Sequence, residues 1–248
     1  MIGLIKNELV KVFNQKKIYI FLALVFGHII FSIVLSLMGI INPELTGQTF
    51  AYDNLSLLAQ FLLPIFSIIL IGDMITEELV KGTFKLSLIH PVSRKEYLTG
   101  KFLSLGIILG ILLLSSLVFS YISGTFIFGW GESFQIGQKA LSTQHGIIWT
   151  LFSHFISIIP IMAFNMYVFI LAMKLETSGG LVGIGIGIYL IMDVIRLFIA
   201  GLRPFVIINY FRFYENLLAG LAPQELISAI LIISIYGMAG YLVSLRIV

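Results

Sequence analysis

Opposite charges inside an apolar run are the first candidates for chemistry in this sequence. Asp193 and Arg196 lie in one such run, and at a spacing of i, i+3 they share a helix face. A charged pair at membrane depth indicates either a polar contact in a substrate path or a structural ion pair whose arginine extends outward. Asn165, in another apolar run, is a further candidate for lining a path.

Enzymatic motifs are missing from the sequence. None of the four histidines belongs to an H-E-x-x-H zinc motif, and cysteine is absent. The sequence "EELVKG" begins like the E-E-x-x-x-R motif of intramembrane CAAX-type proteases, but Gly82 replaces the arginine. Gly100-Lys101 is no phosphate-binding loop, because Lys95 replaces the required glycine and Phe102 the Ser or Thr. We therefore predict no catalytic residue, no metal site and no directly bound cofactor.

The composition identifies the solvent of this chain. Of its 248 residues, 59% are hydrophobic and only 11% are charged, whereas a soluble domain is about 25% charged. A soluble fold could not bury this much apolar surface, so the chain must lie in a lipid bilayer. The net charge of +3 is not gathered into a basic stripe, and we expect no nucleic-acid partner.

Six apolar runs are long enough to cross a bilayer. They are apolar on all sides, unlike barrel strands, and about 20 residues of helix span about 30 Å of hydrocarbon. We predict an all-α integral membrane protein with one domain, residues 1–248. The expected spans are residues 18–41, 52–75, 102–128, 146–173, 181–200 and 226–245.

The distribution of lysine and arginine sets the expected orientation. With the N-terminus inside, eleven of the 15 basic residues lie on the cytoplasmic side and four lie outside, so both termini are expected to be cytoplasmic. Residues 1–17 alternate apolar and basic positions at helical spacing, which predicts an in-plane amphipathic helix on the inner leaflet; a plain positive anchor is the alternative.

The expected outer segments differ in character. Residues 42–51 and 129–145 are expected to be irregular loops. Residues 201–223 are apolar and aromatic, and we expect a re-entrant or interfacial element before the last span.

A glycine pattern marks the fifth expected span. Gly179, Gly183 and Gly187 recur at a spacing of four and form a small-residue face. Such a face allows close helix packing. It indicates either packing within the chain or contact with a second copy.

The most polar stretch of the chain, Thr76–Lys101, divides into defined parts. Gly82 permits a sharp turn, and residues 83–90 have the pattern of a short half-buried helix that Pro91 ends. Ser93 and Glu96 form an S-x-x-E capping box, so a new helix is expected to start at Arg94. We interpret this bracket as a docking site for a soluble partner; a solvated connecting loop is the alternative.

This stretch resembles the loop signature of ABC-2 type permeases. The residues that carry the resemblance are Glu78, Gly82-Thr83, Leu88, Pro91-Val92-Ser93-Arg94 and Lys101. The resemblance extends over the chain through the N-terminal helix, six spans and the apolar outer segment before the last span. The size and small outer loops look most like the bacitracin-resistance and lantibiotic-immunity permeases.

The resemblance implies a half-transporter that depends on a separate ATP-binding subunit, which supplies ATP and Mg. A second permease chain, identical or a sister, would complete the transporter in a bacterial cytoplasmic membrane. The ATPase-contacting coupling segment would comprise Glu78, Gly82, Thr83, Phe84, Leu88, Pro91, Ser93 and Arg94. Spans two and five usually line the path in this family, which makes Asn54 and Asp193 candidates. With Asn165 and Arg196, which the apolar runs themselves indicated, the candidate path residues are Asn54, Asn165, Asp193 and Arg196.

The cargo can be inferred only from the expected chemical character of the transport path. Apolar and aromatic walls suit amphipathic peptides, lipid-like molecules or hydrophobic drugs, and we favour the export or clearance of a peptide antibiotic. Three alternatives stay open: a stand-alone secondary transporter or channel, an immunity protein that binds a toxin without transport, and an ion exporter of the same family.

Overall fold

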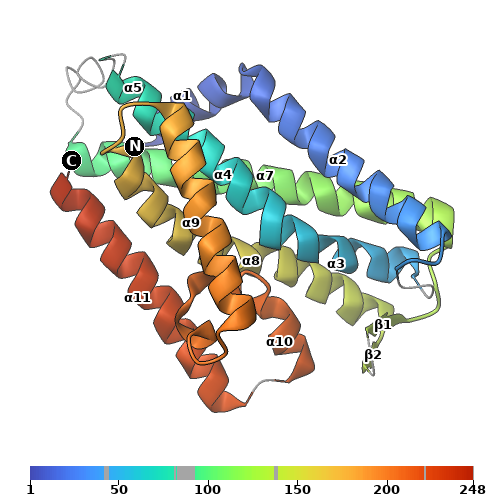
Figure 1. Cartoon of the computed structure of the whole chain (residues 1–248). Helices are drawn as coiled ribbons and strands as arrows, with labels where there is room; N and C mark the ends of the chain where they lie inside the picture. The colour runs from blue at the N-terminus through green and yellow to red at the C-terminus, as the bar shows by residue number, and fades with distance from the viewer. Residues whose placement is uncertain (42–44, 81, 83–92, 137–138, 221, 248) are drawn as a thin grey trace.

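The structure is a computed structural model that describes residues 1–41, 45–80, 82, 93–136, 139–220 and 222–247. Six of its helices are long and apolar enough to cross a membrane, which confirms the predicted all-α integral membrane protein. The two chain termini lie at the same end of the bundle, and the strands β1 and β2 lie at the other (Figure 1). The in-plane position of the first helix and the cytoplasmic side of the termini stay predictions.

The elements follow the apolar runs of the sequence. The bounds are α1 Ile2–Phe13, α2 Lys16–Leu37, α3 Gly47–Leu57, α4 Leu63–Ile71, α5 Glu77–Val80, α7 Arg94–Phe128, α8 Thr143–Ala172, α9 Ser178–Phe198, α10 Phe213–Ala219 and α11 Pro223–Ile247. Two π-helical turns, η1 Leu58–Leu62 and η2 Gly72–Thr76, join α3, α4 and α5 into one continuous span. The 3₁₀ turns η3 Arg203–Phe205 and η4 Ile207–Tyr210 lie between α9 and α10.

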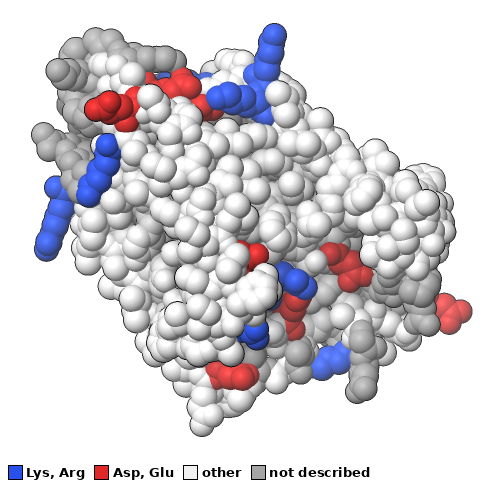
Figure 2. Space-filling view, in the orientation of Figure 1, with Lys and Arg blue, Asp and Glu red and all other residues white. Residues whose placement is uncertain are grey.

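The second and fourth spans form the centre of the bundle. In the most apolar window of each span, 67% of the residues of Gly47–Val80 and 56% of those of α8 are buried, against 28%, 22% and 11% for α2, α9 and α11. The three peripheral helices therefore present most of their apolar side chains outward, as lipid-facing helices do. On the face shown in Figure 2, charged side chains gather towards the two ends of the bundle, with a broad uncharged area between them.

The segments that join the spans are more regular than the sequence indicates. We expected residues 42–51 and 129–145 to be irregular, and this was wrong for part of each segment. Helix α3 already begins at Gly47, because Thr46 and Thr49 form a capping box. Strands β1 Phe134–Ile136 and β2 Lys139–Leu141 pair as an antiparallel hairpin. Residues 201–223 contain the predicted short helical elements, η3, η4 and α10.

The glycines of α9 pack differently from the expected pattern. A Cβ atom at Gly179, Gly183 or Gly187 would meet no described atom within 4 Å, so this face makes no close helix contact within the chain. The close contact is made by Gly185 instead, where a Cβ atom would lie 2.8 Å from Ile68 Cγ2 on α4. The expectation of packing within the chain through the spaced glycines was therefore wrong.

This difference within one helix predicts unequal effects of the same substitution. Gly185→Val would overpack the α9–α4 contact, and we expect a cost of about 1–3 kcal/mol, or about 2–12 °C in Tm. Gly183→Val adds the same side chain to the same helix in open space and is the matched control. Thermal unfolding of the detergent-solubilised monomer measures both, and equal Tm values for the two variants would contradict the packing.

Candidate functional site

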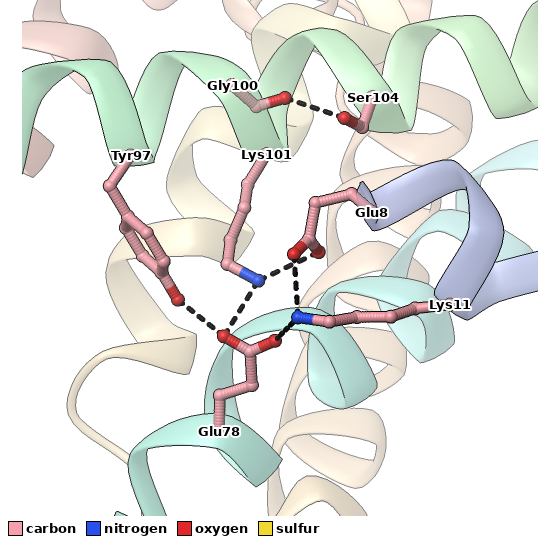
Figure 3. A network of polar contacts seen from close by, with 7 residues as sticks. All are labelled: Glu8, Lys11, Glu78, Tyr97, Gly100, Lys101 and Ser104. Atoms are coloured by element: carbon pink, nitrogen blue, oxygen red, sulfur yellow. Dashed lines mark hydrogen bonds and ion pairs between the residues drawn. The ribbon is translucent and has the colours of Figure 1, made fainter. Parts of the chain in front are cut away.

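A ring of alternating charges joins three helices at the end of the bundle that carries the termini (Figure 3). Lys101 on α7 places its ammonium nitrogen 2.9 Å from Glu8 Oε2 on α1 and 2.9 Å from Glu78 Oε2 on α5. Lys11 closes the ring from α1, with its nitrogen 3.0 Å from Glu8 Oε1 and 2.8 Å from Glu78 Oε1. Two carboxylates and two ammonium groups leave the ring electrically neutral.

The contact of α1 with α7 brings these charges together. Gly100 lies in this contact, where a Cβ atom would lie 2.2 Å from Leu4 Cδ2 and the Leu4 side chain would have to move. Glu8 belongs to the face of α1 that this contact buries, and it is only 4% exposed. Lys101 follows Gly100 directly and points toward Glu8 and Glu78 (Figure 3).

Burial makes the ring expensive to break. Lys101 is 0% exposed, so its charge has exchanged water for the two carboxylates and for the ring of Tyr97, whose centroid lies 4.9 Å from the nitrogen. The Tyr97 hydroxyl donates a further hydrogen bond of 2.7 Å to Glu78 Oε2. A buried pair of this kind adds little net stability over apolar packing, but removing one partner strands the other charge.

Lys11 lies at the solvent edge of the ring. Partial burial opposes its charged form, but the hydrogen bonds and attraction of Glu78 and Glu8 outweigh this effect and raise the pKa of Lys11 above its ordinary value. The side chain is therefore a cation at neutral pH and holds the outer oxygens of both carboxylates.

The ring flanks the polar stretch that sequence analysis singled out. Helix α5 ends at Val80, two residues after Glu78, and Gly82 follows with φ +69°, the left-handed conformation that its predicted turn requires. Helix α7 starts at Arg94, as predicted, because Ser93 Oγ accepts from the backbone N–H of Glu96 and the Glu96 carboxylate accepts from Ser93. The ring therefore ties both ends of this stretch to α1.

Part of the predicted coupling segment lies outside the described residues. Thr83, Phe84, Leu88 and Pro91 belong to that part, as does the predicted short helix at residues 83–90. Glu78, Gly82, Ser93 and Arg94 are described, and of these Glu78 belongs to the ring. A contact of any of these residues with an ATPase subunit stays a prediction.

Two of the four candidate path residues form one cluster. Both Arg196 Nε and Nη2 lie 2.8 Å from Asp193 Oδ1 on α9, and Gln60 Nε2 from η1 donates to the same oxygen over 3.2 Å. The Tyr189 hydroxyl donates to the backbone carbonyl of Gln60. The hydrogen bonds of Gln60 thus join α9 to the π turn of the second span.

The two candidate asparagines make other contacts. Asn165 on α8 accepts a 2.7 Å hydrogen bond from Ser67 on α4, and Asn54 donates a 2.9 Å bond to the Phe50 carbonyl within α3. Among the hydrogen bonds of the described residues, none joins either asparagine to Asp193. Their place in a path stays a prediction.

Sequence analysis missed four residues of these clusters, namely Glu8, Lys11, Tyr97 and Gln60. Glu8 left a signal, because it lies three residues after Ile5 and four before Val12, on the apolar face of α1. A carboxylate on an apolar face predicts a buried basic partner. Nothing in the sequence says that the partner lies 93 residues later, at Lys101.

Removing the central ammonium should destabilise the protein strongly. Lys101→Met leaves the Glu8 and Glu78 carboxylates facing each other in a buried site, and we expect a loss of about 3–5 kcal/mol of unfolding free energy. Lys95→Met, at an exposed position of the same helix, is the matched control and should change it by no more than about 0.5 kcal/mol. Denaturation in mild detergent measures both variants.

A compensating change tests whether charge is the cause. Adding Glu8→Gln to Lys101→Met restores neutrality between Glu78 and Lys11, so the double variant should recover part of the lost stability. A Lys101→Met variant as stable as Lys95→Met, or a double variant less stable than either single one, would contradict the ring.

A model of a known protein family matches this chain. The family model for the ABC-2 family transporter protein matches residues 4–178, more than two thirds of the 248-residue chain. A search of curated proteins found no match. The matched range contains the whole charged ring, the polar stretch and the first four spans. The chain therefore belongs to the ABC-2 transporter family, whose members are the membrane components of ABC transporters and not their ATPases.

Proposed function

We propose that this chain is the permease half of an ATP-driven exporter and moves or clears an amphipathic or hydrophobic cargo. The observation that carries this proposal is the charged ring of Glu8, Lys11, Glu78 and Lys101, which joins α1, α5 and α7 at both ends of the polar stretch. A soluble subunit that pushes on residues 81–93 would act on the second span, the third span and α1 at once.

The second span is suited to respond to such a push. Its π turn η2 lies directly before α5, and a π turn is a local irregularity that recurs at functional sites. Asp73 in this turn accepts two hydrogen bonds from Lys17 at the start of α2, at 2.7 and 2.9 Å. Movement of α5 would therefore reach the first span as well.

In this proposal ATP and Mg are bound by the partner subunit. The coupling segment, with Glu78, Gly82, Thr83, Phe84, Leu88, Pro91, Ser93 and Arg94, would contact that subunit. Family membership supports an ATP-binding partner. A second permease chain, the same or a sister, would complete the transporter, and the open face of the spaced glycines on α9 supports such a contact.

The apolar character of the bundle supports a hydrophobic or amphipathic cargo. A cavity of about 360 Å³ lies among α8, α9 and α11, and its walls are mainly aromatic and aliphatic, with Phe164, Tyr167, Met192 and Tyr236 among them. Such walls suit a large apolar molecule better than an ion or a sugar. We favour a peptide antibiotic as cargo, a place among the bacitracin-resistance and lantibiotic-immunity permeases, and a bacterial cytoplasmic membrane.

We assign the Asp193–Arg196 pair a structural role, because Gln60 completes it and ties α9 to the second span. Asp193→Asn should therefore lower the Tm, since Arg196 loses its buried counter-charge, by an amount that corresponds to about 1–3 kcal/mol. Transport per folded molecule should stay within about twofold of wild type, a change of no more than about 0.4 kcal/mol in barrier. A full loss of transport at unchanged Tm would give the pair a direct role in the path.

The ATPase partner is tested by purification. The tagged chain, extracted gently from its native membrane, should bring a stoichiometric P-loop ATPase that mass spectrometry identifies, and scrambling residues 83–90 should remove it. Glu132→Ala, at the opposite end of the bundle, is the control and should retain the partner. A chain that comes out without an ATPase in every detergent would contradict the proposal and favour a stand-alone transporter or a toxin-binding protein.

The coupling role of the turn is tested by a matched pair of glycines. Gly82 and Gly39 have nearly the same φ, +69° and +70°, and neither would place a Cβ atom within 4 Å of a described atom. Substitution by Ala should therefore cost both positions about 1–2 kcal/mol of backbone strain. Only Gly82→Ala, alone or with Pro91→Ala, should uncouple ATP hydrolysis from transport in reconstituted vesicles. Equal coupling in the Gly82 and Gly39 variants would refute the role of the turn.

A further inference from the structure

A second cavity lies between α2 and α3 and differs from the apolar one in its polar lining. It has a volume of about 260 Å³. Helix α2 contributes His28 and Ser32, and α3 contributes Asp53, Asn54 and Ser56. Asp53 supplies the carboxylate among the described lining residues, and none of these residues is a lysine or an arginine.

One side chain in this wall has a hydrogen-bonding atom left over. Asn54 is only 4% exposed. Its amide nitrogen donates a 2.9 Å hydrogen bond to the Phe50 carbonyl. Because a carbonyl oxygen can only accept, this bond fixes which side of the amide is the nitrogen. Its Oδ1 is therefore an acceptor, and that atom has no hydrogen-bond partner among the described residues. A buried acceptor without a partner is costly, so its retention indicates a ligand that donates to it.

The side chains of Asp53 and Asn54 supply the acceptors of this wall. The Asn54 backbone carbonyl is already occupied, because it accepts from the Leu58 N–H and lies 3.4 Å from His28 Nε2. The wall thus offers a carboxylate and an amide oxygen on two consecutive residues. A primary ammonium group carries one positive charge and three N–H donors, and it matches this set.

The size and the apolar residues of the cavity indicate which kind of molecule carries the ammonium group. The cavity is smaller than the usual ligand pocket of about 300–1,000 Å³, so it accommodates a head group and not a whole drug-sized molecule. Phe31 and Leu57 line the same cavity and are 60% and 44% exposed on the outside of the bundle. An apolar chain on the ammonium group would lie along these side chains and continue into the lipid.

We propose that this cavity binds the primary ammonium group of an amphipathic molecule, with Asp53 as the counter-charge and Asn54 Oδ1 as an acceptor. The proposed binding is inferred from the cavity alone. The interpretation of the cavity as a cargo site rests on the proposed function. Two sources share this chemistry: an amine of a cargo peptide and the ethanolamine head group of a membrane lipid. A quaternary ammonium group lacks N–H donors and is excluded.

The test measures binding to the full chain in nanodiscs made only of phosphatidylcholine, whose head group is quaternary. Radiolabelled dodecylamine should bind saturably, above its uptake by empty discs, and dodecyltrimethylammonium should fail to compete. Asp53→Asn and Asn54→Leu should each weaken binding by about tenfold or more, because each removes a polar partner of the ammonium charge. Glu132→Gln, an exposed carboxylate outside the cavity, is the matched control and should bind as wild type does.

A third variant protects the test against misfolding. Ser32→Phe fills the cavity from the α2 wall without changing Asp53 or Asn54, and it should abolish saturable binding at unchanged Tm. Phosphatidylethanolamine added to the discs should compete if the lipid is the natural ligand, and an absence of competition supports a cargo amine. Dodecylamine that binds equally to wild type, Asp53→Asn and Ser32→Phe would overturn the cavity as its site.

The outcome is separable from that of the proposed function. The nanodisc experiment needs no ATPase subunit, and the purification experiment needs no cavity ligand. If the chain binds dodecylamine but no ATPase is purified with it, the binding-site proposal stands and the exporter proposal is contradicted. If an ATPase is purified with the chain but dodecylamine shows no saturable binding, the exporter proposal stands and the binding-site proposal is contradicted.

Discussion

The ammonium group of Lys101 imposes the main constraint on this structure. It is wholly buried at the end of the bundle that carries the termini, and the Glu8 and Glu78 carboxylates, with the Tyr97 ring, compensate for the water it has lost. These carboxylates come from α1 and α5, so all three helices must keep their positions for the charge to be tolerated. The cost of a stranded charge, more than the net gain of the ion pairs, makes the three helices one unit.

The remaining polar contacts link this unit to the other spans. Polar side chains in the two π turns of the second span reach different neighbours. Asp73 in η2 holds Lys17 of α2, and Gln60 in η1 holds Asp193 of α9. The most buried span thus connects the charged ring to the lipid-facing helices, as the moving part of an alternating-access transporter would.

The sequence predicts those features that depend on local pattern. Apolar runs located the six spans, and Ser93 with Glu96 located the start of α7, because a capping box involves only one helical turn. Partners distant in sequence are set by packing, and the pairing of Glu8 with Lys101 depends on the packing of α1 against α7. Each π turn adds one residue to a helical turn, and the apolar periodicity of the sequence does not predict this insertion. The β1–β2 hairpin was missed because its strands have three residues each and too few positions for alternation to be seen.

In the proposed exporter α1 and α7 move together when the ATPase acts, and one distance tests this motion directly. The chain has no cysteine, so spin labels can be placed at will on exposed positions near the ring. Labels at Lys6→Cys on α1 and Lys95→Cys on α7 report the unit itself, and labels at Lys95→Cys and Glu176→Cys report its motion against the α8–α9 connection. Double electron–electron resonance compares the complex without nucleotide and with trapped nucleotide. We predict an unchanged first distance and a second one that shifts by several ångströms, whereas a first distance that shifts as much as the second would contradict a rigid unit.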